Sequence, residues 1–214
     1  MKTPSNYTST HKCQRPASRY RETRFLKSCD ILSQLPLDSS REVAFAGRSN
    51  SGKSSAINLL TGQKYLARIS KTPGRTQLLN FFLVEQDCYL VDLPGYGFAR
   101  VPDEMRFHWQ GLLQQYLMKS KALRGVMLLM DIRHPLTNMD KRFLECLASR
   151  DMQAHVLLTK SDKLSRTKAI AILRQLQETL LADFSGVSSQ LFSALTGNGV
   201  NEAHAQLDRW LLRG

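Results

Sequence analysis

Short apolar runs alternate with longer segments of helical periodicity along the chain, beginning near residue 42. The runs have the length of buried strands, and the longer segments place apolar residues three or four positions apart, as one helix face requires. Strands are predicted at 42–46, 78–84, 88–92, 126–131, 155–159 and 190–193. Helices are predicted at 53–60, 103–119, 137–149, 165–181 and 200–212. This alternation predicts an α/β fold, with a mostly parallel sheet and helices on both faces.

One connection departs from that rule. Only Glu85, Gln86 and Asp87 separate the second predicted strand from the third. A parallel crossover needs a dozen or more residues, so these two strands must form an antiparallel hairpin. The sequence therefore predicts a six-stranded sheet with one antiparallel strand.

The first 24 residues differ from the rest. They are rich in Ser, Thr, Pro, Lys and Arg, contain a single acidic residue, Glu22, and show no apolar periodicity. We expect residues 1–24 to form a flexible basic arm and residues 25–214 to form one domain. A transit peptide is the alternative for this segment, but the apolar face of an amphipathic helix is missing.

Charge adds a prediction about partners. The 214-residue chain has 30 basic and 18 acidic residues, a formal net charge of +12. Such an excess favours a polyanionic partner, and nucleic acid is preferred because no amphipathic basic helix or lipidation signal indicates a membrane. No apolar run approaches the roughly 20 residues that span a bilayer.

The four cysteines form no CxxC pair, which favours a reducing, cytoplasmic location without disulfides. A monomer is expected.

A phosphate-binding loop follows the first predicted strand. The segment fits the pattern G-x-x-x-x-G-K-[ST] between a strand and a helix, and consists of Gly47, Arg48, Ser49, Asn50, Ser51, Gly52, Lys53 and Ser54. Backbone N–H groups of such a loop surround the phosphates, and the helix N-terminus adds partial positive charge. We expect Lys53 to reach the β- and γ-phosphates and the Ser54 hydroxyl to bind Mg²⁺.

Two further segments have the composition of nucleotide-dependent switches. Asp92, Leu93, Pro94 and Gly95 form a D-x-x-G motif in which Asp92 can hold Mg²⁺ and the Gly95 N–H can contact the γ-phosphate. A Thr before the second strand must reach the metal and the γ-phosphate, and we choose Thr76 over Thr72 for its spacing. The nucleotide-contacting residues predicted around it are Gly74, Arg75, Thr76, Gln77 and Leu78.

Base recognition is predicted at the ends of the last two strands. Thr159, Lys160, Ser161 and Asp162 fit the T/N-K-x-D pattern of GTPases. A carboxylate at Asp162 can accept both N1–H and the 2-amino group of guanine, whereas adenine leaves it underpaired. The sixth predicted strand ends in the tripeptide Phe192, Ser193 and Ala194. Its backbone N–H groups are expected to contact guanine O6.

Together these motifs resemble those of the translation-factor-type P-loop GTPases, and more closely those of the bacterial EngB family. The closest correspondence is in the segments 47–55, 71–77, 92–97 and 131–135. The resemblance runs from about Phe25 to the C-terminus. It implies a Ras-like domain with strand order 2-3-1-4-5-6, GTP and GDP as ligands, and Mg²⁺. It further implies a role in assembly of the large ribosomal subunit, in which the protein would contact ribosomal RNA. A requirement in cell division and septation is also implied.

The hydrolytic machinery is expected to act slowly without a partner. Tyr96 occupies the position where Ras-type enzymes place a water-orienting Gln. The residues with predicted catalytic roles are Lys53, Thr76, Gly95 and Asn50. Asn50 occupies the loop position where some such enzymes hold K⁺; the alternative is that it only stabilises the loop. His134 is expected to have a structural or partner-contact role.

Two other functions use the same loop. A division-apparatus interaction protein could keep GTP as a structural ligand, and its partner affinity would then not depend on the nucleotide state. A small-molecule phosphotransferase would need an acceptor pocket and a lid with arginines, and would have no use for the T-K-x-D segment. Guanine selectivity separates the second alternative from a GTPase.

Overall fold

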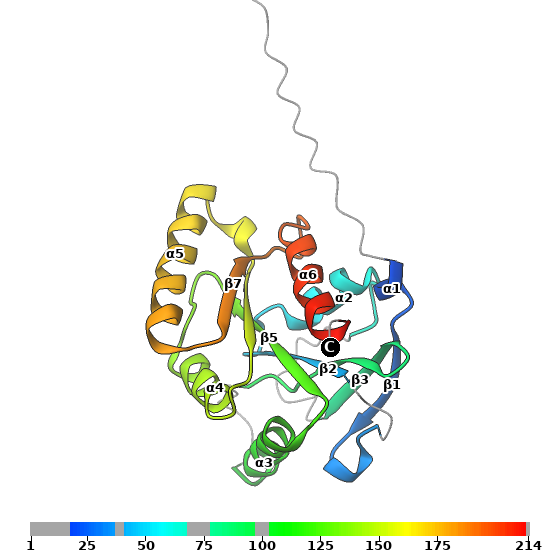
Figure 1. The fold of residues 1–214 in the computed structure, drawn as a ribbon. Helices are drawn as coiled ribbons and strands as arrows, with labels where there is room; N and C mark the ends of the chain where they lie inside the picture. Colours follow the sequence, from blue (N-terminus) through cyan, green and yellow to red (C-terminus); the bar gives the residue numbers. More distant parts are fainter. Residues whose placement is uncertain (1–17, 37–40, 68–77, 97–102, 213–214) are drawn as a thin grey trace, which may run out of the picture.

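The computed structural model describes residues 18–36, 41–67, 78–96 and 103–212. Side chains are described from residue 19 onward and, in the helix 103–119, from residue 111 onward. A single sheet runs through the molecule (Figure 1). Its strands are β1 (Arg24–Cys29), β2 (Arg41–Gly47), β3 (Leu79–Glu85), β4 (Cys88–Asp92), β5 (Leu123–Asp131), β6 (Ala154–Thr159) and β7 (Val187–Leu191). Their order is β1-β3-β4-β2-β5-β6-β7.

The predicted hairpin is confirmed. β3 pairs with β4 in antiparallel register, and β4, β2, β5, β6 and β7 are mutually parallel. Without β1, the order equals the one that the family resemblance implied. The sheet has seven strands where six were predicted. β1, the additional strand, pairs antiparallel to β3 at the sheet edge, and its first residues are exposed, so it shows no buried apolar run.

The last strand was placed three residues too late. β7 spans Val187–Leu191, whereas the prediction was 190–193. This edge strand pairs only with β6, and the segment Ser188-Ser189-Gln190 is polar. An edge strand with one neighbour needs no continuous apolar run, so hydrophobicity located only its final residues.

Helices cover both faces, as predicted. The helices are α1 (Ser18–Arg21), α2 (Lys53–Thr61), α3 (Asp103–Lys119), α4 (Asn138–Ala148), α5 (Arg166–Asp183) and α6 (Val200–Leu211), with short 3-10 turns η1 (Leu32–Gln34) and η2 (Ser161–Lys163). α1, α2 and α6 lie together on one face; α3, α4 and α5 contribute to the core of the other. Within the described residues, no helix has the length and apolar character needed to cross a bilayer.

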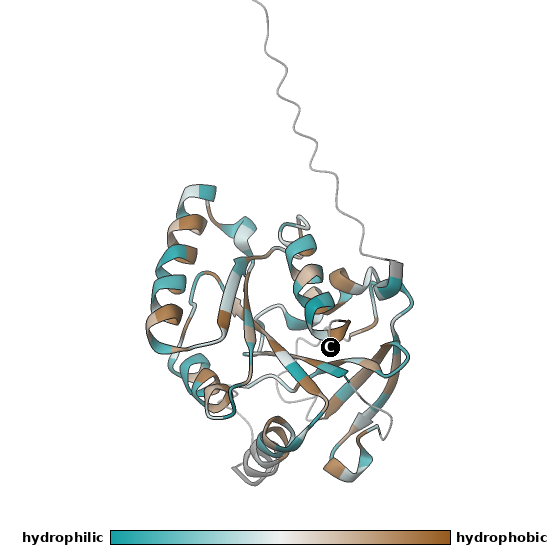
Figure 2. Ribbon diagram, in the orientation of Figure 1, coloured by the Kyte–Doolittle hydropathy of each residue, from teal (hydrophilic) through white to brown (hydrophobic). Residues whose placement is uncertain are grey.

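Alternation along β2 shows how one strand serves both cores. Val43 and Phe45 pack toward α2 and α6, while Ala44 and Ala46 face the side of α3 and α4. All four are buried, because successive side chains of a strand point to opposite faces and both faces are covered. Figure 2 shows hydrophobic residues concentrated in the strands, and helices such as α5 that alternate hydrophilic and hydrophobic residues.

The expected boundary of the N-terminal arm needs correction. Residues 1–17 lie outside the described part of the chain, but Tyr20 and Thr23, within the predicted arm, are buried against the domain. Tyr20 is fully buried, stacks on His204 with ring centroids 4.7 Å apart, and donates a 2.6 Å hydrogen bond to Asp208. The Gln63 side chain donates to the carbonyl of Arg21 at 3.0 Å. These contacts are long-range, so local composition gave no signal of them.

Candidate nucleotide site

The predicted motifs meet at one edge of the sheet. β2, β4, β5 and β6 are parallel, and each is followed by a motif segment that begins at its carboxyl end. The pairing register places the carboxyl ends of these strands side by side, because Phe45 pairs with Asp92 and Asp131 pairs with Thr159. Ligands of open α/β sheets bind outside the carboxyl ends of the strands, where the strand order reverses on either side of β2.

The loop between β2 and α2 has the shape of a phosphate cradle. Its first turn closes where the Ser51 N–H donates to the Arg48 carbonyl at 3.0 Å. Asn50 and Gly52 have φ of 64° and 93°. Asn tolerates this left-handed region and Gly occupies it without strain, so both residue types suit the backbone. Gly52 is the N-cap of α2, whose first amides are free to face an anion.

Gly47 allows the cradle to lie directly on the sheet. A Cβ there would lie 2.5 Å from Ser51 Oγ and 2.8 Å from the Leu129 carbonyl, too close for any side chain. Ser51 is buried, and within the described residues its Oγ has no hydrogen-bond partner. An unpaired buried hydroxyl costs free energy unless a ligand or water completes it. The loop therefore fits a polar ligand such as a phosphate group.

Lys53 is engaged by the D-x-x-G segment. Its ammonium contacts the Asp92 carboxylate, and both side chains are largely buried. The Leu93 N–H donates to the Phe45 carbonyl at 3.0 Å, which extends the pairing of the two strands and holds Asp92 beside the loop. A lysine that is expected on the phosphates thus has an internal carboxylate as its partner in this structure.

The residues present fit Mg²⁺. Ser54 follows Lys53 in the first turn of α2, and Asp92 is at the end of β4. A hydroxyl and one carboxylate are hard oxygen donors of the kind that bind Mg²⁺ together with nucleotide phosphates. Among the described residues no cluster of three or more His, Cys, Asp or Glu side chains could hold a metal. Thr76, the third predicted ligand, lies outside the described residues.

The residues after Asp92 run along the phosphate loop. The Tyr96 N–H donates to the Gly47 carbonyl, and its carbonyl accepts from the Ser49 N–H, each at 3.3 Å. Gly95 lies next to the loop, where a Cβ would be in ordinary contact with the Ser49 nitrogen at 3.4 Å. The D-x-x-G turn is therefore docked on the phosphate loop through the backbone.

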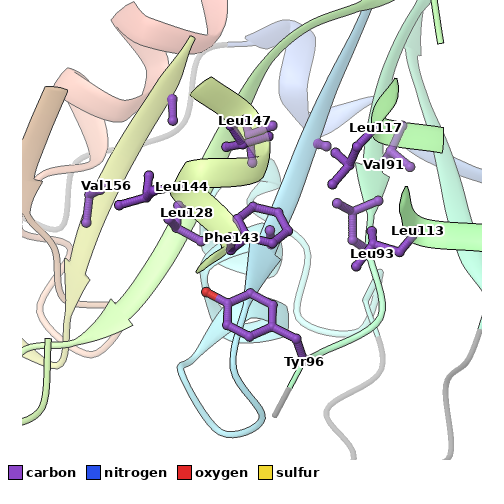
Figure 3. Close-up of a cluster of buried hydrophobic side chains, with 14 of the residues drawn as sticks. Val91, Leu93, Tyr96, Leu113, Leu117, Leu128, Phe143, Leu144, Leu147 and Val156 are labelled. Atoms are coloured by element: carbon purple, nitrogen blue, oxygen red, sulfur yellow. The ribbon is translucent and has the colours of Figure 1, made fainter. Parts of the chain in front are cut away.

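The Tyr96 side chain lies in the core of the α3–α4 face. Its ring stacks on Phe143 of α4, and the ring centroids are 5.0 Å apart. Figure 3 shows the two side chains next to each other. The hydroxyl donates a 2.8 Å hydrogen bond to Asp140. Burial first, then the charge and hydrogen bond of Asp140, raises the pKa of Tyr96 well above its usual value, so the phenol remains a donor.

The base-reading residues are also brought together. The Ser193 hydroxyl donates to Asp162 Oδ1 at 2.6 Å, and Lys163 lies 3.5 Å from Oδ2. The hydrogen bond from Ser193 is the main reason why the pKa of Asp162 is lowered. Phe192 is buried and bonds through its N–H to the Leu158 carbonyl at 2.8 Å, which fixes this segment beside β6. Asp162 is thus held as a carboxylate at the site edge.

Lys160 joins the two halves of the site. It has a left-handed backbone with φ of 58°, and its Nζ donates to the Asn50 carbonyl at 2.8 Å and to Asp131 at 2.9 Å. The Thr159 hydroxyl donates to the Ser51 carbonyl at 2.6 Å. The T-K-x-D segment and the phosphate loop therefore hold each other in place.

Asp131 was given no role from the sequence. It accepts bonds from Arg133 and Lys160, and these, led by the Arg133 side chain, hold its pKa far below the usual range. Its position at the end of β5, level with the other motifs, is the signal that could have found it. His134 offers its backbone carbonyl to Arg48 at 3.2 Å, while its own side chain is exposed.

Part of the predicted site cannot be placed in this geometry. Gly74, Arg75, Thr76 and Gln77 lie outside the described residues, and Leu78 is an exposed residue directly before β3. Ala194 packs against the core beside α6. The Arg48 side chain contacts Asp140 and the His134 carbonyl, and its prediction as a nucleotide contact stays a prediction.

Fold and site together define a P-loop GTPase. A family model described as a 50S ribosome-binding GTPase matches residues 42–160. Probable GTP-binding proteins EngB from Pasteurella multocida and Nitrosomonas eutropha are each 49% identical, over 191 and 195 residues; the alignments cover 89% and 91% of this chain and 93% and 87% of theirs. The chain belongs to the EngB family of GTP-binding proteins.

Solved structures agree on the fold. The crystal structure of a probable GTP-binding protein engB aligns with a TM-score of 0.61 at 23% identity, covering 78% of this chain and 96% of that one. Era from Aquifex aeolicus, solved with GDP and AlF4⁻, aligns with a TM-score of 0.64 at 20% identity, covering 81% of this chain and 57% of that one. At these identities the likeness concerns architecture.

Proposed function

We propose that this protein is a Mg²⁺-dependent guanine-nucleotide switch with slow intrinsic hydrolysis, and that it acts in assembly of the large ribosomal subunit. The observation that carries the guanine assignment is the Asp162 carboxylate, held by Ser193 at 2.6 Å and tied to the phosphate loop through Lys160. A fixed acceptor pair suits the two parallel donors of guanine.

The net charge of the chain and the description of its matching family both support a ribosomal partner. The net charge is +12, and the matching family is described as 50S ribosome-binding. Neutralising phosphates of RNA releases counterions, so such binding should weaken steeply with salt. A requirement in cell division and septation would follow indirectly from impaired ribosome assembly, with the protein acting in the cytoplasm.

Co-sedimentation with 50S subunits tests this proposal. We expect binding with a non-hydrolysable GTP analogue to exceed binding with GDP, and to fall as salt is raised. The Asp162→Asn variant is the matched control: it should lose the response to the GTP analogue and recover it with the xanthosine analogue. Absence of subunit binding in both nucleotide states would overturn the ribosomal assignment and direct the search to division proteins.

Within the site, Ser54, Asp92 and Thr76 would hold Mg²⁺, which when bound offsets negative charge on the phosphates. Lys53 would then exchange Asp92 for phosphate oxygens, and Gly95 would offer its N–H to the γ-phosphate. No described side chain takes the water-orienting place of Gln, because the Tyr96 hydroxyl is committed to Asp140. This supports a low intrinsic rate.

We further propose K⁺ as an activator at Asn50. An FeoB G-domain from S. thermophilus, 24% identical with a TM-score of 0.57, was solved with GDP, AlF4⁻ and K⁺. Asn50→Gly removes the carboxamide and keeps a residue that tolerates φ of 64°. Hydrolysis by the wild type should be faster in K⁺ than in Na⁺, and the variant should lose that difference. Equal wild-type rates in both salts would exclude the K⁺ role.

A further inference from the structure

Asp140 is a buried carboxylate that was not among the predicted nucleotide-contacting residues. It lies in the first turn of α4, and none of it is exposed. One carboxylate oxygen, Oδ2, accepts the Thr137 N–H at 2.8 Å and the Thr137 hydroxyl at 2.7 Å, which caps the helix. The other, Oδ1, accepts the Tyr96 hydroxyl at 2.8 Å.

Asp140 also connects to the phosphate loop. Arg48 Nε lies 3.6 Å from Asp140 Oδ2, and a second Arg48 nitrogen donates to the His134 carbonyl at 3.2 Å. Arg48 and Tyr96 are themselves paired through a parallel bridge between their backbones. Asp140 therefore contacts, from α4, the two segments that flank the γ-phosphate position.

We propose that Asp140 is a positioning residue that, through Tyr96, holds Gly95 against the phosphate loop for contact with the γ-phosphate. Tyr96 directly follows Gly95, so fixing the ring between Asp140 and Phe143 restricts the backbone on one side of the glycine. The phosphate loop restricts it on the other through the two 3.3 Å bonds of Tyr96. GDP has no γ-phosphate, so the anchor should favour the triphosphate only. This inference rests on the proposed switch role of Gly95.

The chain supplies a matched control. Tyr116 is also fully buried on the α3–α4 face and donates a 2.7 Å hydrogen bond to a buried carboxylate, that of Glu42. That pair joins the C-terminal part of α3 to the first residues of β2, at the opposite end of the strand from the phosphate loop. Tyr116→Phe thus removes the same bond as Tyr96→Phe, in a comparable environment, away from the site.

The experiment measures affinities for GDP and a non-hydrolysable GTP analogue, with thermal unfolding, in Tyr96→Phe, Tyr116→Phe and Asp140→Asn. Tyr96→Phe keeps the stacked ring and should weaken the triphosphate analogue about fivefold, the effect of one lost hydrogen bond, with GDP unchanged. Asp140→Asn should shift the ratio in the same direction. Tyr116→Phe should lower the unfolding temperature without changing the ratio.

Other outcomes contradict the proposal. The Asp140 contacts would have only a stabilising role under any of three results. These are an equal loss of affinity for both nucleotides in Tyr96→Phe, an unchanged affinity ratio in Tyr96→Phe, or the same change of ratio in Tyr116→Phe. Co-sedimentation of the wild type with 50S subunits separates the two levels of inference. If subunit binding does not differ between GDP and the GTP analogue, the proposed switch itself is wrong; if it differs and Tyr96→Phe leaves the affinity ratio unchanged, only the anchor is wrong.

Discussion

The base half and the phosphate half of the site are prepared for a nucleotide to different degrees. In the base half, Asp162 is already held by Ser193, and Lys160 by Asp131 and the Asn50 carbonyl. In the phosphate half, Lys53 contacts Asp92. Guanine can therefore meet its acceptor as it stands, whereas phosphates must replace Asp92 as the partner of Lys53.

The difference has a physical cause. The hydrogen bond from the neutral Ser193 hydroxyl leaves Asp162 its charge and further lone pairs for guanine. Rigidity there lowers the entropy lost on binding. A lysine ammonium buried without a counter-charge would be costly, so in this structure it is paired with a carboxylate. Base selectivity should thus require no rearrangement of Asp162. Phosphate binding should require Lys53 to exchange the Asp92 carboxylate for phosphate oxygens.

The largest effect is expected from Asp162→Asn. The amide donates where the carboxylate accepted, so GTP affinity should fall about 10³-fold or more while xanthosine nucleotides become preferred. Competition binding with both nucleotide series measures it. The control, Lys163→Ala, removes an exposed cation 3.5 Å from the same carboxylate and should change GTP affinity less than about threefold. Unchanged GTP affinity in Asp162→Asn would refute the base assignment.

A smaller effect, about 100-fold on GDP and GTP alike, is expected from Lys53→Ala, because charge-assisted bonds to phosphate oxygens are lost. Asp92→Asn makes the reciprocal change and leaves Lys53 free for phosphates. In Mg²⁺-free buffer this second variant should bind GDP more tightly than wild type, and added Mg²⁺ should help it less. Titrations with and without Mg²⁺ test the pair of variants. Equal losses of GDP affinity in both would contradict an exchange of partners.

About a tenfold effect is expected from Ser193→Ala, which leaves Asp162 without its 2.6 Å donor. The pKa of Asp162 is depressed in the folded protein, mainly by that bond, so the bond favours the carboxylate. In the variant the pKa should rise, and the loss of GDP affinity on acidification should begin at a higher pH than in wild type. GDP binding as a function of pH measures the shift; superimposable curves would contradict it.

The smallest effect concerns stability away from the site. Burial lowers the pKa of His155 from about 6.5, while its ring contacts Ser188 and Gln190. Because the unfolded state then binds the proton more strongly, the contribution of His155 to stability is present above pH 6.5 and is lost as pH falls below it. His155→Gln should flatten the decline of unfolding free energy in that range. Parallel stability curves for the two proteins would show that His155 does not cause it.

Much of the site followed from local sequence. Asn50 and Gly52 suit their backbone because a positive φ permits few residue types, and this constraint is local. The order of strands and motifs along the chain placed Asp92 and Asp162 at the same sheet edge, because parallel strands end together. The sequence by itself determined the class of fold and the presence of a phosphate loop, and it predicted which carboxylate reads the base.

Only the tertiary structure decided which side chains meet across distant segments. The pairs Tyr96–Asp140 and Lys160–Asp131, and the docking of Tyr20 on α6, join residues far apart in the chain. Edge strand β1 likewise exists through its pairing with β3 and not through its own hydrophobicity. Periodicity and motif spacing report local constraints. These contacts depend on how elements pack, and they determine how Gly95, Lys160 and the N-terminal segment are held.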